Sequence, residues 1–483
     1  MLKIKNVLFT FFIAVIFLFF FLKYANYLFI EFNEGYQVQL ALSLKENFIY
    51  QSRYEPRKIA DPGITVGFPQ HYLQLIFFLI FGKRLESVRY FNSTIFILLL
   101  LLIYFYTKNI LAPIYIFSFY LIASWFRNDI SRYNGEILST IFIILTICFL
   151  DKFKKFKKNK DLLISGFFLS LAITNKFISL ITFFILFSIY DLKLKYKIIF
   201  TLTVFASYLL TNFLVIINSY LIKFRNLEGL FGFFVIYKMQ FKNIILGNFN
   251  KINLFEQNLI DFIFMKIRYF EGGMINFIFF YILPQIFLLT QGSFLHSIFS
   301  LLALYKIFFT MFWRHYIIFL LVLFSLIVKK MYKIKWFNIL IFFIIFFNIF
   351  QFLINKKSIF FQEIYLNNRS KNKQNEIAKR IDKIQGNIYT NGYWQGPEIS
   401  FYLKKIFKDR MAYNQINDKD NNFLLTFSYQ DNAWPFTDLE KMCGEIVYCE
   451  KDYILCRMKK GIFFNDLSDK NRQTKKCSKF NFN

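Results

Sequence analysis

A series of long, nearly unbroken apolar runs is the feature that most constrains the fold of this chain. The first run extends from Val7 to Ile30, and a bilayer core about 30 Å thick needs roughly 20 such residues in a helix. This run is too long and too uniformly apolar for a signal peptide and has no small-residue cleavage site, so we expect a retained membrane helix. The hydrophobic content of 56%, with 72 Phe, and the mean hydropathy of +0.41 agree with a membrane protein.

The apolar runs predict about eleven membrane-spanning helices. The predicted spans are Val7–Ile30, Phe91–Tyr106, Ile110–Ser124, Ile137–Leu150, Leu162–Ile173, Phe177–Tyr190, Ile198–Tyr220, Met274–Thr290, Phe294–Phe312, Tyr316–Val328 and Trp336–Leu353. The shorter segment Tyr72–Phe81 fits an interfacial helix on the outer surface instead. The sequence therefore predicts an all-α polytopic membrane domain over residues 1–354, in which the first outer loop covers residues 31–88.

Lysine clusters between the runs set the predicted orientation. With Lys3 and Lys5 in the cytoplasm, alternating crossings place the clusters Lys152–Lys160, Lys193–Lys197 and Lys329–Lys335 on the same side, as the positive-inside rule requires. We therefore expect a multi-pass protein of the inner (plasma) membrane with a cytoplasmic N-terminus and a periplasmic C-terminal region. Much of the net charge of +29 is then an orientation signal, and we do not expect nucleic acid as a partner.

The same rule divides the apolar stretch Leu162–Tyr190. A single crossing would put the two lysine clusters that flank it on opposite sides of the membrane. Two short crossings keep both clusters inside and place Lys176 at an outer turn. The sequence therefore predicts two helices that meet at Lys176.

The tail after Asn355 loses the long apolar runs and predicts a small extracytoplasmic α/β domain over residues 355–483. Asn387–Trp394 and Phe423–Tyr429 are typical of strands, and Pro397–Phe407 is typical of a helix with proline in its first turn. The tail has four cysteines, which could form disulfides in three possible pairings or stay free thiols: Cys443, Cys449, Cys456 and Cys477. Their spacing does not match a zinc site.

Charged side chains collect in the predicted outer loops, whereas the spans hold almost no acidic residues. The outward-facing charged residues are Glu31, Glu34, Arg53, Arg57, Lys58, Asp61, Arg127, Asp129, Arg132, Glu136, Lys176, Arg314 and His315. They predict a charge-lined cavity where a carboxylate acts as a general base and cations hold a phosphate leaving group. Lys306 lies within a span, where a cation either finds an anionic partner such as a lipid phosphate or snorkels to the headgroups.

The order of several short motifs resembles that of the GT-C glycosyltransferases. Asn33-Glu34-Gly35-Tyr36 and Asp61-Pro62-Gly63-Ile64-Thr65-Val66-Gly67 follow the first span. Later motifs are Asn134-Gly135-Glu136-Ile137, the segment Ser165–Phe177 with Thr174-Asn175-Lys176, and Trp313-Arg314-His315-Tyr316. The closest resemblance is to the RgtA/B/C/D-like branch, which is related to lipid A aminoarabinose transferase and the protein O-mannosyltransferases.

The resemblance implies a transferase that moves a sugar from a polyprenyl-phosphate donor to a lipid, glycan or protein acceptor on the periplasmic side. Inversion at the sugar is implied, without a metal or another cofactor. The catalytic residues would be Glu34 and Asp61, and the residues that bind substrate or phosphate would be Lys176, Lys306, Arg314 and Arg57.

Asn33 departs from the acidic pair that is usual in this family. An amide cannot accept a proton usefully at neutral pH, so the base role goes to Glu34, with Glu31 as a substitute. The departure also leaves open a divergent or inactive member. For Glu136 the sequence favours a structural pairing with Arg132.

Three other functions remain open. A transporter or flippase of lipid-linked sugars is disfavoured because the sequence shows no internal repeat, few mid-span Pro or Gly apart from Pro284, and no acidic residue within a span. A polymerase of glycan repeat units would be expected to carry its large loop between late helices. A non-catalytic membrane scaffold stays possible because of Asn33.

Overall fold

The computed structural model describes twelve stretches of the chain, which together contain the helices and strands. They are residues 4–30, 32–47, 67–223, 273–291, 294–310, 313–390, 399, 401–403, 408–409, 422–427, 443–449 and 453–459. The chain forms two compact units. The first comprises Met1–Asn26 and Ala60–Ile364, and the second comprises Tyr27–Ile59 and Tyr365–Asn483.

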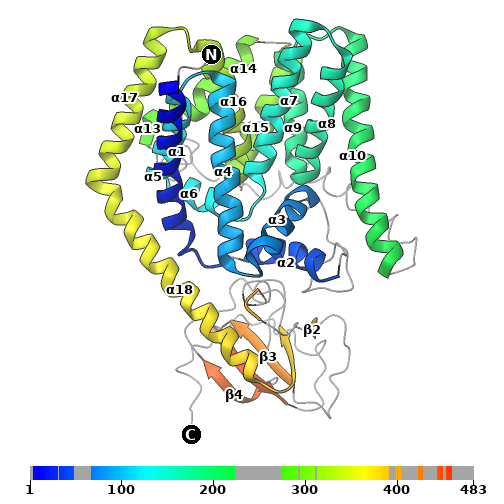
Figure 1. Cartoon of the computed structure of the whole chain (residues 1–483), viewed down its shortest axis with the longest axis vertical. Helices are drawn as coiled ribbons and strands as arrows, with labels where there is room; N and C mark the ends of the chain where they lie inside the picture. Colours follow the sequence, from blue (N-terminus) through cyan, green and yellow to red (C-terminus); the bar gives the residue numbers. More distant parts are fainter. Residues whose placement is uncertain are drawn as a thin grey trace, which may run out of the picture. The chain divides into compact units, whose positions relative to one another are not determined.

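The first unit is a helical bundle (Figure 1). Its helices are α1 (Ile4–Ala25), α3 (Phe68–Phe81), α4 (Leu85–Thr107), α5 (Leu111–Ile122), α6 (Ser124–Ser131), α7 (Glu136–Phe156), α8 (Asn159–Asn175), η1 (Phe177–Ser179), α9 (Leu180–Ile189), α10 (Leu194–Lys223), α13 (Gly273–Phe277), η3 (Ile278–Ile282), α14 (Leu283–Gln291), α15 (Phe294–Thr310), α16 (Trp313–Met331), α17 (Lys335–Gln351) and η4 (Phe352–Lys356). Helix α18 (Lys357–Lys383) begins in this unit and ends in the second.

Each of the predicted spans overlaps a helix of this bundle. Within the described part of the chain, four helices are long and apolar enough to cross a membrane by length and composition: Leu85–Thr107, Leu194–Phe213, Gly273–Gln291 and Lys335–Ile354. Shorter apolar helices accompany them. The chain is therefore a multi-pass membrane protein, and the number of eleven crossings stays a prediction.

The predicted break at Lys176 is confirmed. Helix α8 ends at Asn175, Lys176 has an extended backbone with φ −145° and ψ 108°, and η1 begins at Phe177. Two helices therefore replace the single helix that the apolar stretch would otherwise allow.

Helix α16 is the core of the bundle. Its residues from Tyr316 to Phe324 are almost completely buried, which is typical of a helix that has neighbours on every side. Tyr115 of α5 packs against Phe280 and Phe324 with ring centroids 4.8 and 5.1 Å apart. Large aromatic side chains thus fill the space between α5, η3 and α16.

A buried polar network joins α5, α13 and α17. The Tyr115 hydroxyl donates to Asn276 Oδ1 at 3.0 Å, and Asn276 Nδ2 donates to Asn348 Oδ1 at 2.8 Å. Asn348 Nδ2 in turn donates to Ser118 Oγ at 3.1 Å. These side chains are at most 1% exposed, so the network fixes the three helices in one register.

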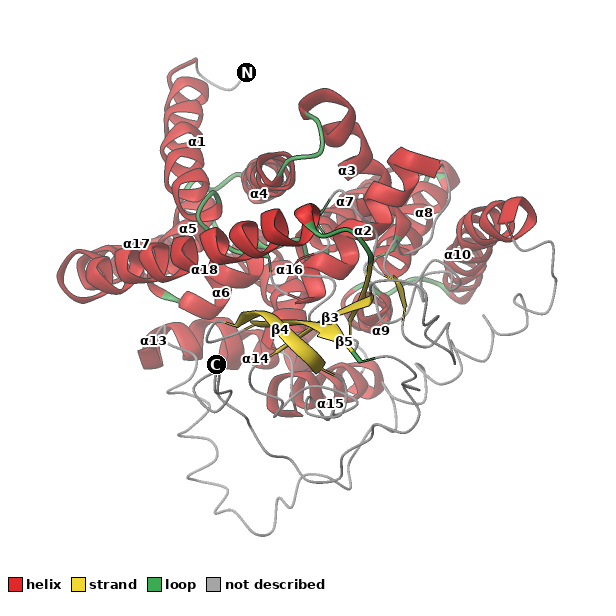
Figure 2. Cartoon of the chain, turned by 90° about the horizontal axis from the view of Figure 1, so that it is seen from below, coloured by secondary structure: helices red, strands yellow, loops and turns green. Residues whose placement is uncertain are grey.

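The second unit contains α2 (Phe32–Asn47), the C-terminal part of α18 and a five-stranded sheet. The strands are β1 (Asn387–Thr390), β2 (Lys408–Asp409), β3 (Asn422–Phe427), β4 (Cys443–Cys449) and β5 (Tyr453–Met458), in the order β2-β1-β3-β5-β4. Strand β1 runs parallel to β2 and β3, whereas β5 is antiparallel to β3 and β4. Figure 2 shows three of these strands side by side.

Alternate residues of the strands face opposite sides of this sheet. Ile377 and Ile381 of α18 belong to the same core as Phe423 and Leu425 of β3, so the end of α18 covers one face. Leu424, between those two β3 residues, belongs to a separate core on the other face. The small C-terminal sheet agrees with the predicted α/β domain.

The two predicted strands are confirmed by β1 and β3 where the structure describes them. The predicted helix Pro397–Phe407 is largely outside the described residues, and its described part is a turn in which Tyr402 N–H donates to the Ile399 carbonyl at 3.0 Å. A disulfide joins Cys443 to Cys456, which selects one of the three pairings that the sequence allows.

We predict that Asn348→Leu destabilises the bundle by about 1–2 kcal/mol, because it removes the partner of Ser118 and Asn276 inside an apolar region. Thermal unfolding in detergent measures the loss. Thr94→Val is the control, since the exposed Thr94 hydroxyl donates to the Tyr90 carbonyl of its own helix. Equal melting temperatures for the two variants would contradict the role of the network.

Candidate functional site

Asn175 connects three of the sequence motifs at one end of the bundle. Its carbonyl accepts the Gly67 N–H at 2.8 Å, and its Oδ1 accepts the Gln70 N–H at 3.2 Å. Its Nδ2 donates to the Gly135 carbonyl at 2.8 Å and to Ser139 Oγ at 3.0 Å. Asn175 is fully buried, so one side chain holds the start of α3, the start of α7 and the end of α8 together.

Gly67 is the residue that permits this close approach. A Cβ atom at this position would lie 1.7 Å from the Thr174 carbonyl oxygen, well inside any possible contact distance. The backbone of Gly67 is in the ordinary extended region, with φ −77°, so the requirement for glycine comes from the approach to α8 and not from the torsion angle.

Lys176 forms an ion pair with Glu136 across the same junction. Lys176 Nζ lies 3.3 Å from Glu136 Oε1, and the two side chains are only 12% and 3% exposed. Glu136 lies in the first turn of α7 and Lys176 caps the C-terminus of α8, so each charge sits at the helix end whose dipole favours it. The two helix dipoles therefore add to the attraction between the side chains.

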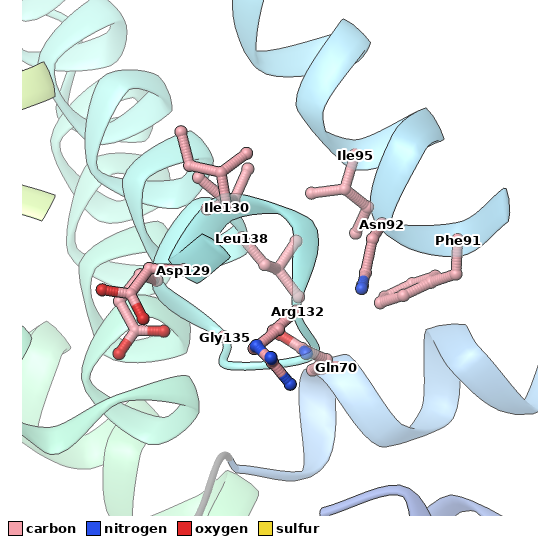
Figure 3. A pocket seen from close by; sticks show the side chains of 11 residues that line it. Gln70, Phe91, Asn92, Ile95, Asp129, Ile130, Arg132, Gly135 and Leu138 are labelled. Carbon is pink, nitrogen blue, oxygen red and sulfur yellow. The ribbon is translucent and has the colours of Figure 1, made fainter. Parts of the chain in front are cut away.

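A small pocket opens beside this ion pair (Figure 3). Its polar lining consists of Gln70 from α3, Asn92 from α4, Asp129 from α6, and Arg132 and Glu136 from the end of α6 and the start of α7. Arg132 is only 7% exposed. The pocket therefore brings two carboxylates and a guanidinium to one place, with the Lys176 ammonium next to them.

Buried hydrogen bonds hold the backbone that carries these side chains. Arg89 Nη1 and Asn92 Nδ2 both donate to the Ser131 carbonyl, at 3.3 and 3.1 Å. The Tyr133 hydroxyl donates to the Gln70 carbonyl at 3.1 Å and lies 3.1 Å from His71 Nδ1. The segment between α6 and α7 is thus fixed to α3 and α4, as a preorganised site requires.

A second buried cation, Arg127, connects α6 to α18 within the first unit. Its Nη2 lies 2.7 Å from Glu363 Oε2, and its Nη1 donates to the Tyr120 and Leu121 carbonyls at 3.1 and 2.9 Å. Burial acts to lower the pKa of Arg127, but the Glu363 carboxylate together with Tyr24 and Tyr120 outweighs it, so that the pKa is raised. Arg127 therefore joins α6 to α18 as a charged and almost fully buried side chain.

The candidate site residues predicted from the sequence fall into three groups. Lys176 lies at the junction, beside the pocket. Glu34 lies in the second unit, in the first turn of α2, and is fully buried. The others are Asp61 and Arg57, which lie outside the described residues, and Lys306 in α15 and Arg314 in α16, whose backbone is described but whose side chains are not.

From the sequence we expected charged residues in the second outer loop, but we did not place Asp129, Arg132 or Glu136 among the site residues. In the structure Glu136 forms an ion pair with Lys176, and Arg132 lines the same pocket, so the expected pairing of Glu136 with Arg132 stays a prediction. The motif Asn134-Gly135-Glu136 was the sequence signal that could have identified Glu136 as a site residue. In the structure Gly135 has φ 86° and turns the chain into α7 directly before Glu136.

Comparisons with known proteins identify the fold. No family model and no curated protein matches this sequence. Two solved structures of ArnT from Cupriavidus metallidurans match it, one bound to undecaprenyl phosphate and one in the apo state. Both have a TM-score of 0.51 at 9% sequence identity, and each match covers 94% of this chain and 98% or 97% of the ArnT chain.

The chain has a GT-C fold. ArnT is the lipid A aminoarabinose transferase of the GT-C superfamily, and the match extends over nearly the whole of both chains. The fold that the sequence motifs implied is therefore confirmed. In this GT-C fold the motifs around Gly67, Glu136 and Asn175 form one contiguous junction.

We predict that Gly67→Ala destabilises the protein by roughly 3 kcal/mol or disrupts its fold, because overpacking against a backbone carbonyl forces α3 away from α8. Thermal unfolding in detergent checks this. The comparison variant is Gly444→Ala, whose φ is not positive and whose new Cβ would meet no atom closer than 3.5 Å, so we expect its stability to change little. A Gly67→Ala protein as stable as Gly444→Ala would show that the junction does not depend on this contact.

Proposed function

We propose that this protein is a membrane glycosyltransferase that moves a sugar from a polyprenyl-phosphate donor to a lipid, glycan or protein acceptor on the outer side of the inner membrane. The observation that carries the proposal is the junction at Asn175, which gathers the motif residues Gly67, Gly135 and Lys176 beside a pocket lined by charged side chains. The GT-C fold supports it, because one ArnT structure of the same fold is bound to undecaprenyl phosphate.

The reaction needs a base, an acceptor hydroxyl and a site for the departing phosphate. The base takes the proton of the acceptor hydroxyl, whose oxygen attacks the anomeric carbon from the face opposite the phosphate. The bond between that carbon and the phosphate oxygen breaks, and the electron pair leaves with the polyprenyl phosphate. The anomeric centre is therefore inverted.

Cations of the first unit suit the leaving phosphate. Lys176 carries three N–H donors, of which the Glu136 carboxylate needs only one, so further donors remain for phosphate oxygens. Arg132 lines the neighbouring pocket, and a guanidinium can bind phosphate through two parallel hydrogen bonds. We propose that these two residues stabilise the phosphate as negative charge develops on it, and that Arg57, Lys306 and Arg314 add to the substrate-binding site.

Glu34 is the carboxylate that we propose as the general base, and Asp61 as a substrate-binding carboxylate of the same reaction. Glu34 stands in the first turn of α2 and is fully excluded from solvent in the described structure. A carboxylate held in a fixed position can take the proton of a substrate hydroxyl that comes within hydrogen-bond reach. Asn33, its neighbour in the sequence, has no comparable basicity.

We predict that Glu34→Gln lowers the rate of sugar transfer by roughly 10²–10⁴, because it removes the proton acceptor and keeps the size of the side chain. The measurement is the release of polyprenyl phosphate from polyprenyl-phosphate sugars by the protein in liposomes, with membrane lipids as acceptors. Glu46→Gln is the matched control, since Glu46 is an exposed glutamate on the same helix.

The outcomes separate the candidate functions. If Glu34→Gln keeps full activity and Asp129→Asn loses it, the general base is Asp129, which lines the pocket, and not Glu34. No transfer by the wild-type protein with any donor, together with movement of the donor across the liposome membrane, would favour a flippase.

A further inference from the structure

Gln374 of α18 holds the backbone of Ile30 through a pair of hydrogen bonds within the second unit. Ile30 N–H donates to Gln374 Oε1 at 3.1 Å, and Gln374 Nε2 donates to the Ile30 carbonyl at 2.7 Å. The two residues are separated by 344 positions in the sequence. One side-chain amide thus satisfies both backbone groups of one residue, as a neighbouring β-strand would.

The two hydrogen bonds from Gln374 matter because of where Ile30 lies in the chain. Residues 28–30 have no regular secondary structure, so their backbone groups need partners from elsewhere in the chain. Ile30 is fully buried and Gln374 is 2% exposed, so water cannot replace the amide easily. Helix α2 begins at Phe32, two residues further along, and Glu34 lies in its first turn.

The contact therefore fixes the chain close to the carboxylate that the proposed function needs. Only three residues lie between Ile30 and Glu34, and consecutive Cα atoms are held about 3.8 Å apart, so a displacement of Ile30 moves the start of α2. The same face of α18 is anchored one and two turns further along, because Ile377 and Ile381 pack in the core of the sheet. Gln374 thus projects from a helix that is itself held in place.

We propose that Gln374 is a positioning residue for the general base: it fixes the Ile30 backbone and so holds Glu34 in the geometry required for proton transfer. This inference rests on the proposed function of Glu34. Gln374 does not contact the reacting atoms, and its contribution is to the orientation of the base. The C-terminal part of the chain then belongs to the catalytic machinery through α18, in addition to forming a separate sheet.

The test is the variant Gln374→Met, which keeps the length of the side chain but neither hydrogen bond. We expect kcat per folded molecule to fall about 100-fold, the size of effect that a misplacement of about 1 Å produces, with KM for the donor unchanged within a factor of two. Asn375→Met is the matched control, since Asn375 is the exposed neighbour on the same helix. Hydrogen exchange followed by mass spectrometry should show faster exchange around Ile30 in Gln374→Met only.

A double-mutant comparison separates a positioning role from a purely structural one. If Gln374 acts through Glu34, the Gln374→Met change leaves the residual rate of Glu34→Gln unaltered. The inference is overturned if Gln374→Met keeps wild-type kcat, or if it lowers the rate equally in both backgrounds. A lack of transfer by the wild-type protein contradicts the proposed function and this inference together, whereas transfer that Glu34→Gln abolishes and Gln374→Met retains contradicts the inference alone.

Discussion

The approach of Gly67 to the end of α8 is the contact on which the candidate site depends. The hydrogen bond from Gly67 N–H to the Asn175 carbonyl, at 2.8 Å, is possible only because no Cβ stands between the two backbones. Helix α3 begins immediately after this contact, and the Asn175 side chain continues it to Gly135 at the start of α7. A bundle of apolar helices has few directional interactions of its own, so such polar contacts decide how the helix ends are arranged.

The ion pair between Glu136 and Lys176 is a consequence of that arrangement. Both side chains are nearly buried, and removing one partner of a buried pair leaves an uncompensated charge that costs about 3–5 kcal/mol. Buried pairs are weak evidence for stability, because well-packed apolar residues would serve as well. Because the pair stands at a pocket that also contains Asp129 and Arg132, we propose that it serves the binding of a charged group.

The sequence predicted the features that depend on local pattern. The apolar runs located the helices, the lysine clusters located the break at Lys176, and the order of weak motifs indicated the GT-C fold. The strands β1 and β3 followed from alternating apolar residues near turn signals. Helix α18 was not predicted, because its sequence is mostly polar and only a narrow stripe, with Ile377 and Ile381, packs against the sheet.

Contacts between distant parts of the sequence could not be predicted in this way. The sequence did not predict that Lys176 reaches Glu136 from the next helix and forms an ion pair with it. The hydrogen bonds between Gln374 and Ile30 join segments that no pattern in a single sequence relates. Residue types and spacing thus indicated which charged residues to consider. Which residues contact each other could be seen only in the three-dimensional structure.

The central claim is that the junction around Asn175 forms a site for a lipid-linked phosphate at Lys176. The most direct measurement is equilibrium binding of polyprenyl phosphate to the purified protein, compared with Lys176→Gln and with Lys160→Gln. Lys160 is an exposed lysine at the opposite end of α8 and serves as the control. Loss of a charge-assisted hydrogen bond should weaken binding roughly tenfold or more in Lys176→Gln, with no change in Lys160→Gln. Equal affinities for all three proteins would contradict the account.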